Sequence, residues 1–289
     1  MLYLNTDLPA LHQLRTEGLP IARGHHDAAL NVWMLNLMPL KCATELDLCR
    51  MLAASGIEVN LTLIKFPEQT YKSTPQAYVE AHYLDLDSAM LRHTIDGLII
   101  TGAPLENIPF EAVRYWEDLC RLMTWSTTHT RSTLNICWAA QAALYFHHRV
   151  PKHPLAAKMF GVFPQTVYRP EHPLMRGLGT AFPMPHSRHT EVQREALPPE
   201  IEVLAGGGKS GLGILADAVR RQVFAIGHLE YEPLTLDGEY RRDLAKGLPI
   251  LPPENYYFDD CPDRGVDFSW RTAALQFYKN WLTTLHPAP

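Results

Sequence analysis

The feature that most limits the possible folds is an alternation of short apolar runs with amphipathic stretches in the first half of the chain. Apolar runs occupy residues 31–38, 96–102 and 132–137, and segments with helical spacing of apolar residues separate them. A strand that is apolar on both faces needs helices on both sides of its sheet. The pattern therefore predicts an α/β fold with a doubly wound, mostly parallel sheet, flavodoxin-like in type.

The second half of the chain has a different texture. After Pro151 the segments become shorter and richer in glycine and proline, which predicts a partly antiparallel C-terminal portion that completes the sheet. The stretch GGGKSG (206–211) lacks the first glycine of a phosphate-binding loop, because Val203 stands there, and it favours a hairpin turn. With no internal repeat, we expect one domain over residues 1–289, made of an N-terminal extension (1–27) and a catalytic core (28–285).

Bulk composition excludes several classes of protein. Of the 289 residues 46% are hydrophobic and 20% charged, and the net charge of −5 with no basic stripe argues against a nucleic-acid partner. No apolar run reaches the ~18 residues of a membrane span, and the first residues lack the pattern of a signal peptide. The five cysteines are odd in number and form no C-x-x-C pair, so we expect reduced thiols in a cytoplasmic protein, and no metal site.

Cys137 ends the apolar run STLNIC, just where a helical stretch, WAAQAALYFHH, begins. In open α/β sheets, sites form at the carboxyl ends of strands. A thiol on a strand-to-helix turn is lifted out of the sheet and lies near the positive end of the new helix, which favours the thiolate. Cys137 is therefore a candidate nucleophile, although an inert buried thiol fits this segment equally well.

A thiol nucleophile usually needs a base, and the chain has fourteen histidines. His93, His129 and His153 lie near predicted helix ends or loops. His228 differs, because it follows the apolar strand QVFAIG, and Glu230 comes two residues later. That spacing lets a carboxylate orient the imidazole in a Cys–His–acid relay. The alternative for His228 is a histidine in a surface loop.

Several segments together resemble one family, the homoserine O-acyltransferases of methionine biosynthesis. They occur in the family's order between about residues 28 and 282: LNLMPLK (35–41), TGAPLE (101–106), YWEDL (115–119), CWAAQAAL (137–144), KMFGVF (158–163), PHSRHTEV (185–192), GHLEY (227–231), TLDGEYRRD (235–243) and NWL (280–282). The resemblance implies a fold like that of class I glutamine amidotransferases and a ping-pong acyl transfer. It also implies small-molecule substrates, no bound cofactor, and a homodimer.

The same resemblance implies roles for individual residues. Cys137 would accept the acyl group, His228 would be the general base, and Glu230 the acid beside it. Lys158, Ser187 and Arg242 match positions that bind substrate, although without the resemblance each would be taken for an ordinary surface residue. Trp138 and Lys41 are expected to support the oxyanion.

Glu106 bears on the acyl donor. In the family this position goes with acyl choice, glycine with succinyl and glutamate with acetyl. A glutamate would place like charges together against a succinyl carboxylate, so acetyl-CoA is the expected cosubstrate rather than succinyl-CoA. The alternative for Glu106 is a carboxylate at a helix entry.

The acceptor stays open between L-homoserine, the family default, and L-serine, which is one methylene shorter. Leu229 and Glu232 depart from the commonest residues after the catalytic histidine, which adds to this doubt. More distant alternatives are a glutamine amidotransferase and a thiol-based sensor. The amidotransferase is disfavoured by Asn135 and Ala139, which stand where glycines flank that class of nucleophile.

Overall fold

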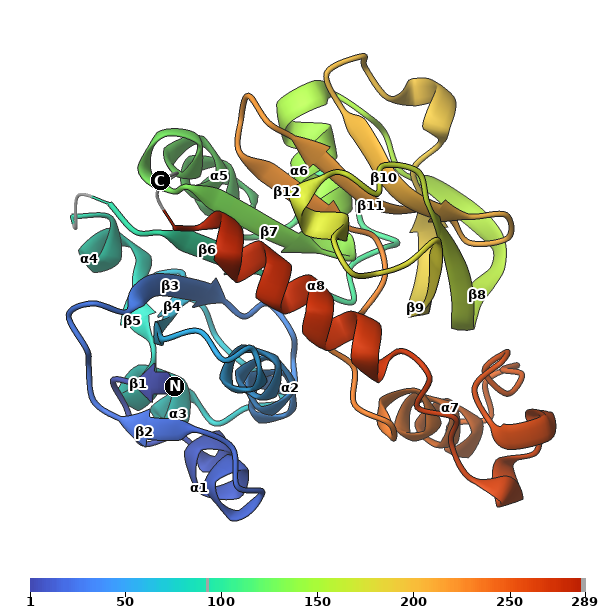
Figure 1. Ribbon diagram of the computed structural model, residues 1–289, viewed down its shortest axis with the longest axis horizontal. Coiled ribbons are helices and arrows are strands. Elements are labelled where there is room, and N and C mark those ends of the chain that lie inside the picture. The colour runs from blue at the N-terminus through green and yellow to red at the C-terminus, as the bar shows by residue number, and fades with distance from the viewer. Residues whose placement is uncertain (92–93, 287–289) are drawn as a thin grey trace.

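The chain forms one mixed sheet with helices on both faces, as a computed structural model shows for residues 1–91 and 94–286 (Figure 1). The described residues contain twelve strands in the order β2-β1-β4-β3-β6-β7-β12-β11-β10-β8-β9, with β5 paired to β4. The pairs from β2 to β12 are parallel, and those from β12 to β9 are antiparallel. This confirms the predicted fold class. His93 lies outside the described residues.

The strands are β1 (Leu2–Leu4), β2 (Ile21–Arg23), β3 (Leu30–Leu35), β4 (Val59–Lys65), β5 (Leu84–Asp85), β6 (Gly97–Ile100), β7 (Ser132–Ile136), β8 (His153–Val167), β9 (Ala181–Glu191), β10 (Glu202–Gly207), β11 (Gly211–Asp217) and β12 (Gln222–Ala225). The α-helices are α1 (Pro9–Thr16), α2 (Lys41–Ala54), α3 (Gln76–His82), α4 (Leu86–Met90), α5 (Trp116–His129), α6 (Trp138–His148), α7 (Thr235–Ala245) and α8 (Arg271–Thr284).

The central strands are buried on both sides because successive side chains enter different cores. In β3, Val32 and Met34 join a core with α2 and α8, whereas Trp33 and Leu35 join one with α5 and α6. Successive residues of a strand point to opposite faces, so an apolar run of this kind needs both helical layers.

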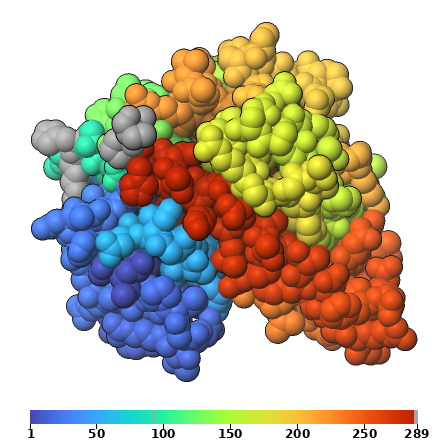
Figure 2. Space-filling view, in the orientation of Figure 1, coloured from blue at the N-terminus to red at the C-terminus, as the bar shows by residue number. Residues whose placement is uncertain are grey.

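Helix α8 covers the middle of one face. It crosses β6 and β7 in Figure 1, and Figure 2 shows the C-terminal part of the chain, in red, between the N-terminal residues and the yellow-green segment. A side chain at Gly97 would come within 2.7 Å of Leu285 and 3.0 Å of Trp281, so the glycine permits this close approach. The Trp281 indole N–H also donates to the Ser132 hydroxyl at 3.0 Å.

Three features of the fold depend on contacts between elements. Residues 78–90, whose apolar pattern alone predicts one helix, are divided into α3, the short strand β5, and α4, because β5 pairs with the end of β4. Helix α5 starts only at Trp116, after a 3₁₀ turn over Phe110–Ala112. The N-terminal segment 1–27 adds β1 and β2 to the same sheet as the rest of the chain.

The glycine-rich stretch 206–211 forms the expected hairpin turn between β10 and β11, which pair antiparallel with Gly207 opposite Gly211. Two long strands, β8 and β9, then form a ribbon that extends the sheet beyond β10. In this ribbon Phe160 pairs with Ser187, which brings the nearby Lys158 of β8 close to Ser187 of β9.

Candidate active site

Cys137 lies on a strained turn between β7 and α6. Its backbone has φ 53° and ψ −111°, a conformation that costs a non-glycine residue about 1–3 kcal/mol. Its N–H donates to the carbonyl of Ala225 at 2.7 Å, which ties the turn to the end of β12. The helix behind it can begin close to the sheet, because Ala139 and Ala140 are small and buried. The turn therefore presents the thiol at the carboxyl edge of the parallel strands.

His228 lies across from Cys137 at the same edge. A Cβ atom placed on Gly102 would be 3.4 Å from Cβ of Cys137 and 3.5 Å from Cε1 of His228, so both side chains lie against one glycine. The backbone N–H of His228 donates to Pro185 at 2.8 Å, and its ring stacks on Tyr231 with centroids 4.1 Å apart. The strand ends thus bring together two residues that are 91 positions apart in the chain.

Glu230 orients the imidazole. Its Oε1 lies 2.6 Å from Nδ1 of His228, and both side chains are buried. Nδ1 then carries the proton toward the carboxylate, which leaves Nε2 for the thiol. Burial alone would lower the pKa of His228, but negative charge at Cys137 and at Glu230 raises it well above its ordinary value. The arrangement therefore favours the protonated imidazole beside the thiol.

The thiol opens into a cavity of about 510 Å³. Its lining includes most of the side chains that the sequence singled out: Cys137, His228, Lys158, Ser187, Arg242 and Glu106. Six separate segments of the chain supply these residues, from the loop after β6 to helix α7. The structure thus brings them into one space of the size that a small polar substrate needs.

Glu239 on α7 connects the residues of one wall of the cavity through hydrogen bonds. One of its carboxylate oxygens accepts from Ser187 Oγ at 2.5 Å and from Lys158 Nζ at 3.1 Å, and the other accepts from the Tyr231 hydroxyl at 3.2 Å. Sequence reasoning missed Glu239, although it lies inside the TLDGEYRRD segment. Only the contact with β8 and β9 distinguishes it from the other charges of that helix.

Arg242 lies one turn further along α7, with its guanidinium half-exposed at the cavity. It holds Asp243 through two bonds, from Nε to Oδ1 at 2.7 Å and from an Nη nitrogen to Oδ2 at 2.9 Å. A fork of donors of this kind matches a carboxylate. Helix α7 therefore carries a carboxylate and a guanidinium to the same cavity.

The two residues expected to support the oxyanion lie behind the cavity. The Lys41 ammonium donates to the carbonyl oxygens of Asn36 at 2.5 Å and Met38 at 3.5 Å, and burial lowers its pKa to about 8. It thus supports the loop whose residue Met38 lines the cavity. The Trp138 ring is fully buried against Phe110, while its backbone opens α6, where the first N–H groups have no partner within the helix.

Glu106 lies in an irregular loop after β6, so it is not a carboxylate at a helix entry. Lys152 fixes this loop by donating to the carbonyl oxygens of Glu106 and Ile108, at 2.7 Å each. The Glu106 residue is partly buried and lines the cavity. Glu106 is therefore one of the residues around the space beside Cys137.

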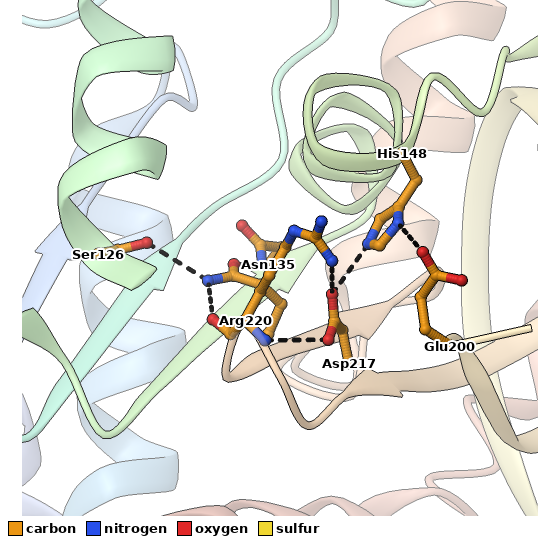
Figure 3. Close-up of polar contacts among 7 residues, drawn as sticks. Ser126, Asn135, His148, Glu200, Asp217 and Arg220 are labelled. Atoms are coloured by element: carbon orange, nitrogen blue, oxygen red, sulfur yellow. Dashed lines mark hydrogen bonds and ion pairs between the residues drawn. The ribbon is translucent and has the colours of Figure 1, made fainter. Parts of the chain in front are cut away.

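A second histidine–carboxylate pair lies at the opposite edge of the sheet (Figure 3). His148 Nε2 is 2.9 Å from Oδ2 of Asp217, and its Nδ1 is 3.5 Å from Glu200. Asp217 also accepts from the backbone N–H and the guanidinium of Arg220. Because this cluster ties the end of α6 to the β11–β12 hairpin, its role is to hold these elements together.

Two further findings concern metals and membranes. Within residues 1–91 and 94–286, no group of three or more histidine, cysteine, aspartate or glutamate side chains is arranged to hold a metal ion. None of the helices in the same residues has both the length and the apolar character needed to cross a membrane.

Comparison with known proteins gives a consistent result. The sequence model described as homoserine O-succinyltransferase matches residues 1–286. A homoserine O-acetyltransferase from Bacteroides thetaiotaomicron is 44% identical over 288 residues, covering 97% of this chain and 94% of the relative. A homoserine O-acetyltransferase from Acetivibrio thermocellus is 42% identical over 282 residues, covering 95% of this chain and 92% of the relative.

Solved structures show the same fold at much lower identity. A glutamine amidotransferase from Methylobacillus flagellatus has a TM-score of 0.60 at 12% identity, covering 91% of this chain and 98% of its own. A glutamine amidotransferase from Thermotoga maritima has a TM-score of 0.58 at 10% identity, covering 91% of this chain and 100% of its own. These likenesses confirm the predicted glutamine amidotransferase-like fold.

Proposed function

Because the chain belongs to the homoserine O-succinyltransferase family, we propose that it transfers the acetyl group of acetyl-CoA to the hydroxyl of L-homoserine through an acyl-Cys137 intermediate. The resemblance found in the sequence is thereby confirmed, and the chain is an acyltransferase of amino-acid biosynthesis. The observation that carries the finer proposal is the single cavity that joins Cys137 and His228 to Lys158, Ser187 and Arg242.

In the first half-reaction the Cys137 thiolate attacks the carbonyl carbon of the thioester. The N–H groups at the start of α6, which have no partner in the helix, are suited to donate hydrogen bonds to the developing oxyanion, and one such donor is worth about 10²–10³-fold in rate. The carbon–sulfur bond to coenzyme A breaks, and the proton on His228 goes to the leaving thiolate. An acetyl group remains on Cys137.

In the second half-reaction His228 removes the proton of the acceptor hydroxyl, and that oxygen attacks the acetyl carbon. General-base help of this kind contributes about 10²–10⁴-fold. The Cys137 sulfur leaves as a thiolate again, and the ester is the product. Arg242, which lines the cavity, would bind the carboxylate of the amino acid, and the Glu239 carboxylate beside Ser187 would bind its ammonium group.

Glu106 supports acetyl over succinyl as the transferred group. Glu106 lines the cavity that holds Cys137, and a succinyl group would bring a second carboxylate into the same partly buried space. Like charges in such a space repel each other. The relatives from B. thetaiotaomicron and A. thermocellus are named as acetyltransferases, which points to the same donor.

Homoserine is favoured over serine as the acceptor because the two unusual residues after His228 do not face the substrate. Leu229 is buried in the core with α8, and Glu232 is bound by Arg50 at 3.2 Å and Arg271 at 3.1 Å. Neither side chain can therefore contact the acceptor, and their departure from the commonest pattern is not a reason to favour serine.

The test is a two-by-two assay of acetyl-CoA or succinyl-CoA against L-homoserine or L-serine, with the Glu106→Gly variant beside the unaltered enzyme. We expect acetyl-CoA with homoserine to give the highest kcat/KM, and Glu106→Gly to raise the succinyl-to-acetyl ratio by at least tenfold. Mass spectrometry should find one acetyl group on the peptide that contains Cys137 when acetyl-CoA is added alone. Equal use of both donors by the unaltered enzyme would contradict the assignment of Glu106.

A glutaminase assay separates this function from that of the amidotransferases with the same fold. We expect no ammonia release from glutamine. For a thiol sensor, His228→Ala would leave function intact, whereas here it should lower kcat at least a hundredfold. A homodimer and a cytoplasmic location remain part of the proposal and can be checked by light scattering and by cell fractionation.

A further inference from the structure

Arg188 on β9 is a fully buried cation that forms no ion pair with a carboxylate among the described residues. The residue is 1% exposed. Its guanidinium donates to two carbonyl oxygens, that of Thr190 at 2.7 Å and that of Ser210 at 2.6 Å. Its Nε is buried without a hydrogen-bond partner in the part of the chain that the structure describes. Buried charges in proteins are normally paired, so this guanidinium requires an explanation.

The hydrogen bonds of Arg188 lead to the turn that carries Cys137. The Thr190 carbonyl, which accepts from Arg188, also accepts from the Gln141 side chain at 3.2 Å. The Thr190 hydroxyl donates back to Gln141 at 2.8 Å, and the Gln141 N–H donates to the carbonyl of Cys137 at 3.2 Å. Buried contacts therefore connect Arg188 to the first turn of α6 and to the nucleophile.

The other charged groups near Arg188 do not balance it. Burial and the charge of Arg188 lower the pKa of the neighbouring His186 well below its ordinary value, so that ring stays neutral. Burial also lowers the pKa of Arg188, and negative charge at Cys137 is the strongest influence that opposes this, ahead of Glu191. The hydrogen bonds through Thr190 and Gln141 lead to the same residue, so Cys137 is the group that the geometry and the charge both connect to this guanidinium.

We propose that Arg188 is a positioning residue that stabilises the thiolate of Cys137, while it holds the turn through Thr190 and Gln141. This goes beyond the imidazole on the cavity side, and it rests on the proposed role of Cys137 as nucleophile. The thiolate would then be stabilised by the Arg188 guanidinium as well as by the His228 imidazolium. Because a buried guanidinium keeps its proton over the whole working range of pH, it would hold this charge in place throughout the reaction cycle.

Several other charged groups face the same thiol. They are His228 and Glu230 after β12, Lys158 on β8, Glu106 after β6, and Glu239, Arg242, Asp243 and Lys246 on and after α7. An experiment must therefore change Arg188 alone and leave these groups in place.

The experiment measures alkylation of Cys137 by iodoacetamide as a function of pH, with each cysteine peptide followed by mass spectrometry. The exposed Cys42 serves as the reference within the same molecule. In Arg188→Met we expect the midpoint of Cys137 alkylation to move to higher pH and the rate at pH 7 to fall about tenfold, since an opposite charge close to an ionisable group favours its charged form. Arg188→Lys should restore most of the rate.

Thr190→Val is the matched control, because it removes the hydroxyl contact with Gln141 but keeps the guanidinium. We expect its alkylation midpoint to equal that of the unaltered chain. If Arg188→Met fails to fold by circular dichroism, Arg188→Gln, which can still donate to the Thr190 carbonyl, takes its place. An unchanged midpoint in a folded, uncharged variant would overturn the proposal. Alkylation needs no acyl-CoA, so failure of the proposed acyl transfer would be seen separately.

Discussion

At the scale of single residues, the acid that orients His228 has a second acid near it. Asp47 on α2 is partly buried. Burial, together with the charges of Glu230 and Glu232, raises the pKa of Asp47 to about 8 from its ordinary 3.8. Asp47 is therefore protonated in the folded chain at neutral pH, whereas it is ionised in the unfolded chain. That difference must make folding less favourable as the pH rises from 4 to 8.

Replacing Asp47 by asparagine removes this titration and tests it directly. We expect the free energy of unfolding of Asp47→Asn to equal that of the unaltered chain near pH 4 and to exceed it by about 1–2 kcal/mol at pH 8. Urea unfolding at both pH values measures the difference. Asp27→Asn, at a fully exposed side chain, is the control, and its free energy of unfolding should equal that of the unaltered chain at both pH values. A gain of equal size at pH 4 and pH 8 would show that Asp47 does not titrate as described.

At the scale of elements, helix α6 is fixed at both ends by different chemistry. Its first turn is held by Cys137 and Gln141 at the carboxyl edge of the sheet, and its last by His148 and Asp217 at the amino edge. Asp217 pairs with Gln222 at the beginning of β12, which places the second cluster at the far end of the strands from the thiol. The cluster therefore lies at the opposite end of α6 from the cavity.

Asp217→Ala should therefore lower stability and spare catalysis. Removing one partner of a buried pair costs about 3 kcal/mol, and we expect that loss in urea unfolding at pH 7. Burial acts to raise the pKa of Asp217, but bonds from Arg220 and His148 outweigh it and lower that pKa. The stabilisation is then present above the ordinary value of 3.8 and disappears as the pH falls below it. Glu200→Ala, at a half-exposed partner of His148, should cost less than about 1 kcal/mol. An equal loss in the two variants would contradict this account.

How far the elements could be predicted depends on what stabilises them. The strands β3, β6 and β7 follow from their apolar runs, because burial on both faces leaves few alternatives. The division of residues 78–90 could not be predicted, since β5 exists only through its pairing with Ile64 and Lys65. Cys137 and His228 were identifiable because both follow apolar strands that end at one edge.

Residues held by contacts between distant elements left no such signal. Glu239 is important because Ser187 and Lys158 of the β8–β9 ribbon reach it, and nothing in its spacing on α7 shows this. Arg188 could be taken for an ordinary charge of β9, because its burial and its link to Gln141 arise only when the ribbon packs on α6. Such roles depend on tertiary packing, which a local pattern does not encode.

At the scale of the whole molecule, the N-terminal segment 1–27 is integrated with the rest. Strand β1 lies between β2 and β4, with Leu2 opposite Val59. Leucines of this segment are fully buried in the core that also contains α2 and α8, and Glu17 holds Arg50 at 2.7 Å. The segment therefore covers an edge of the sheet and one end of α2.

Deleting residues 1–27 should therefore abolish stable folding. Each buried leucine contributes about 1.5–3 kcal/mol, so losing five of them (Leu2, Leu4, Leu8, Leu11 and Leu14) is comparable to the whole stability of a domain. The uncovered edge of β4 would also be open to pairing between molecules. We expect the shortened chain to be aggregated or to unfold at a much lower temperature, as measured by size-exclusion chromatography and calorimetry. Leu11→Ala should cost about 2–5 kcal/mol, while His12→Ala, at an exposed position of the same helix, should cost little. A shortened chain that unfolds at the original temperature would show that the segment is an appendage and not part of the core.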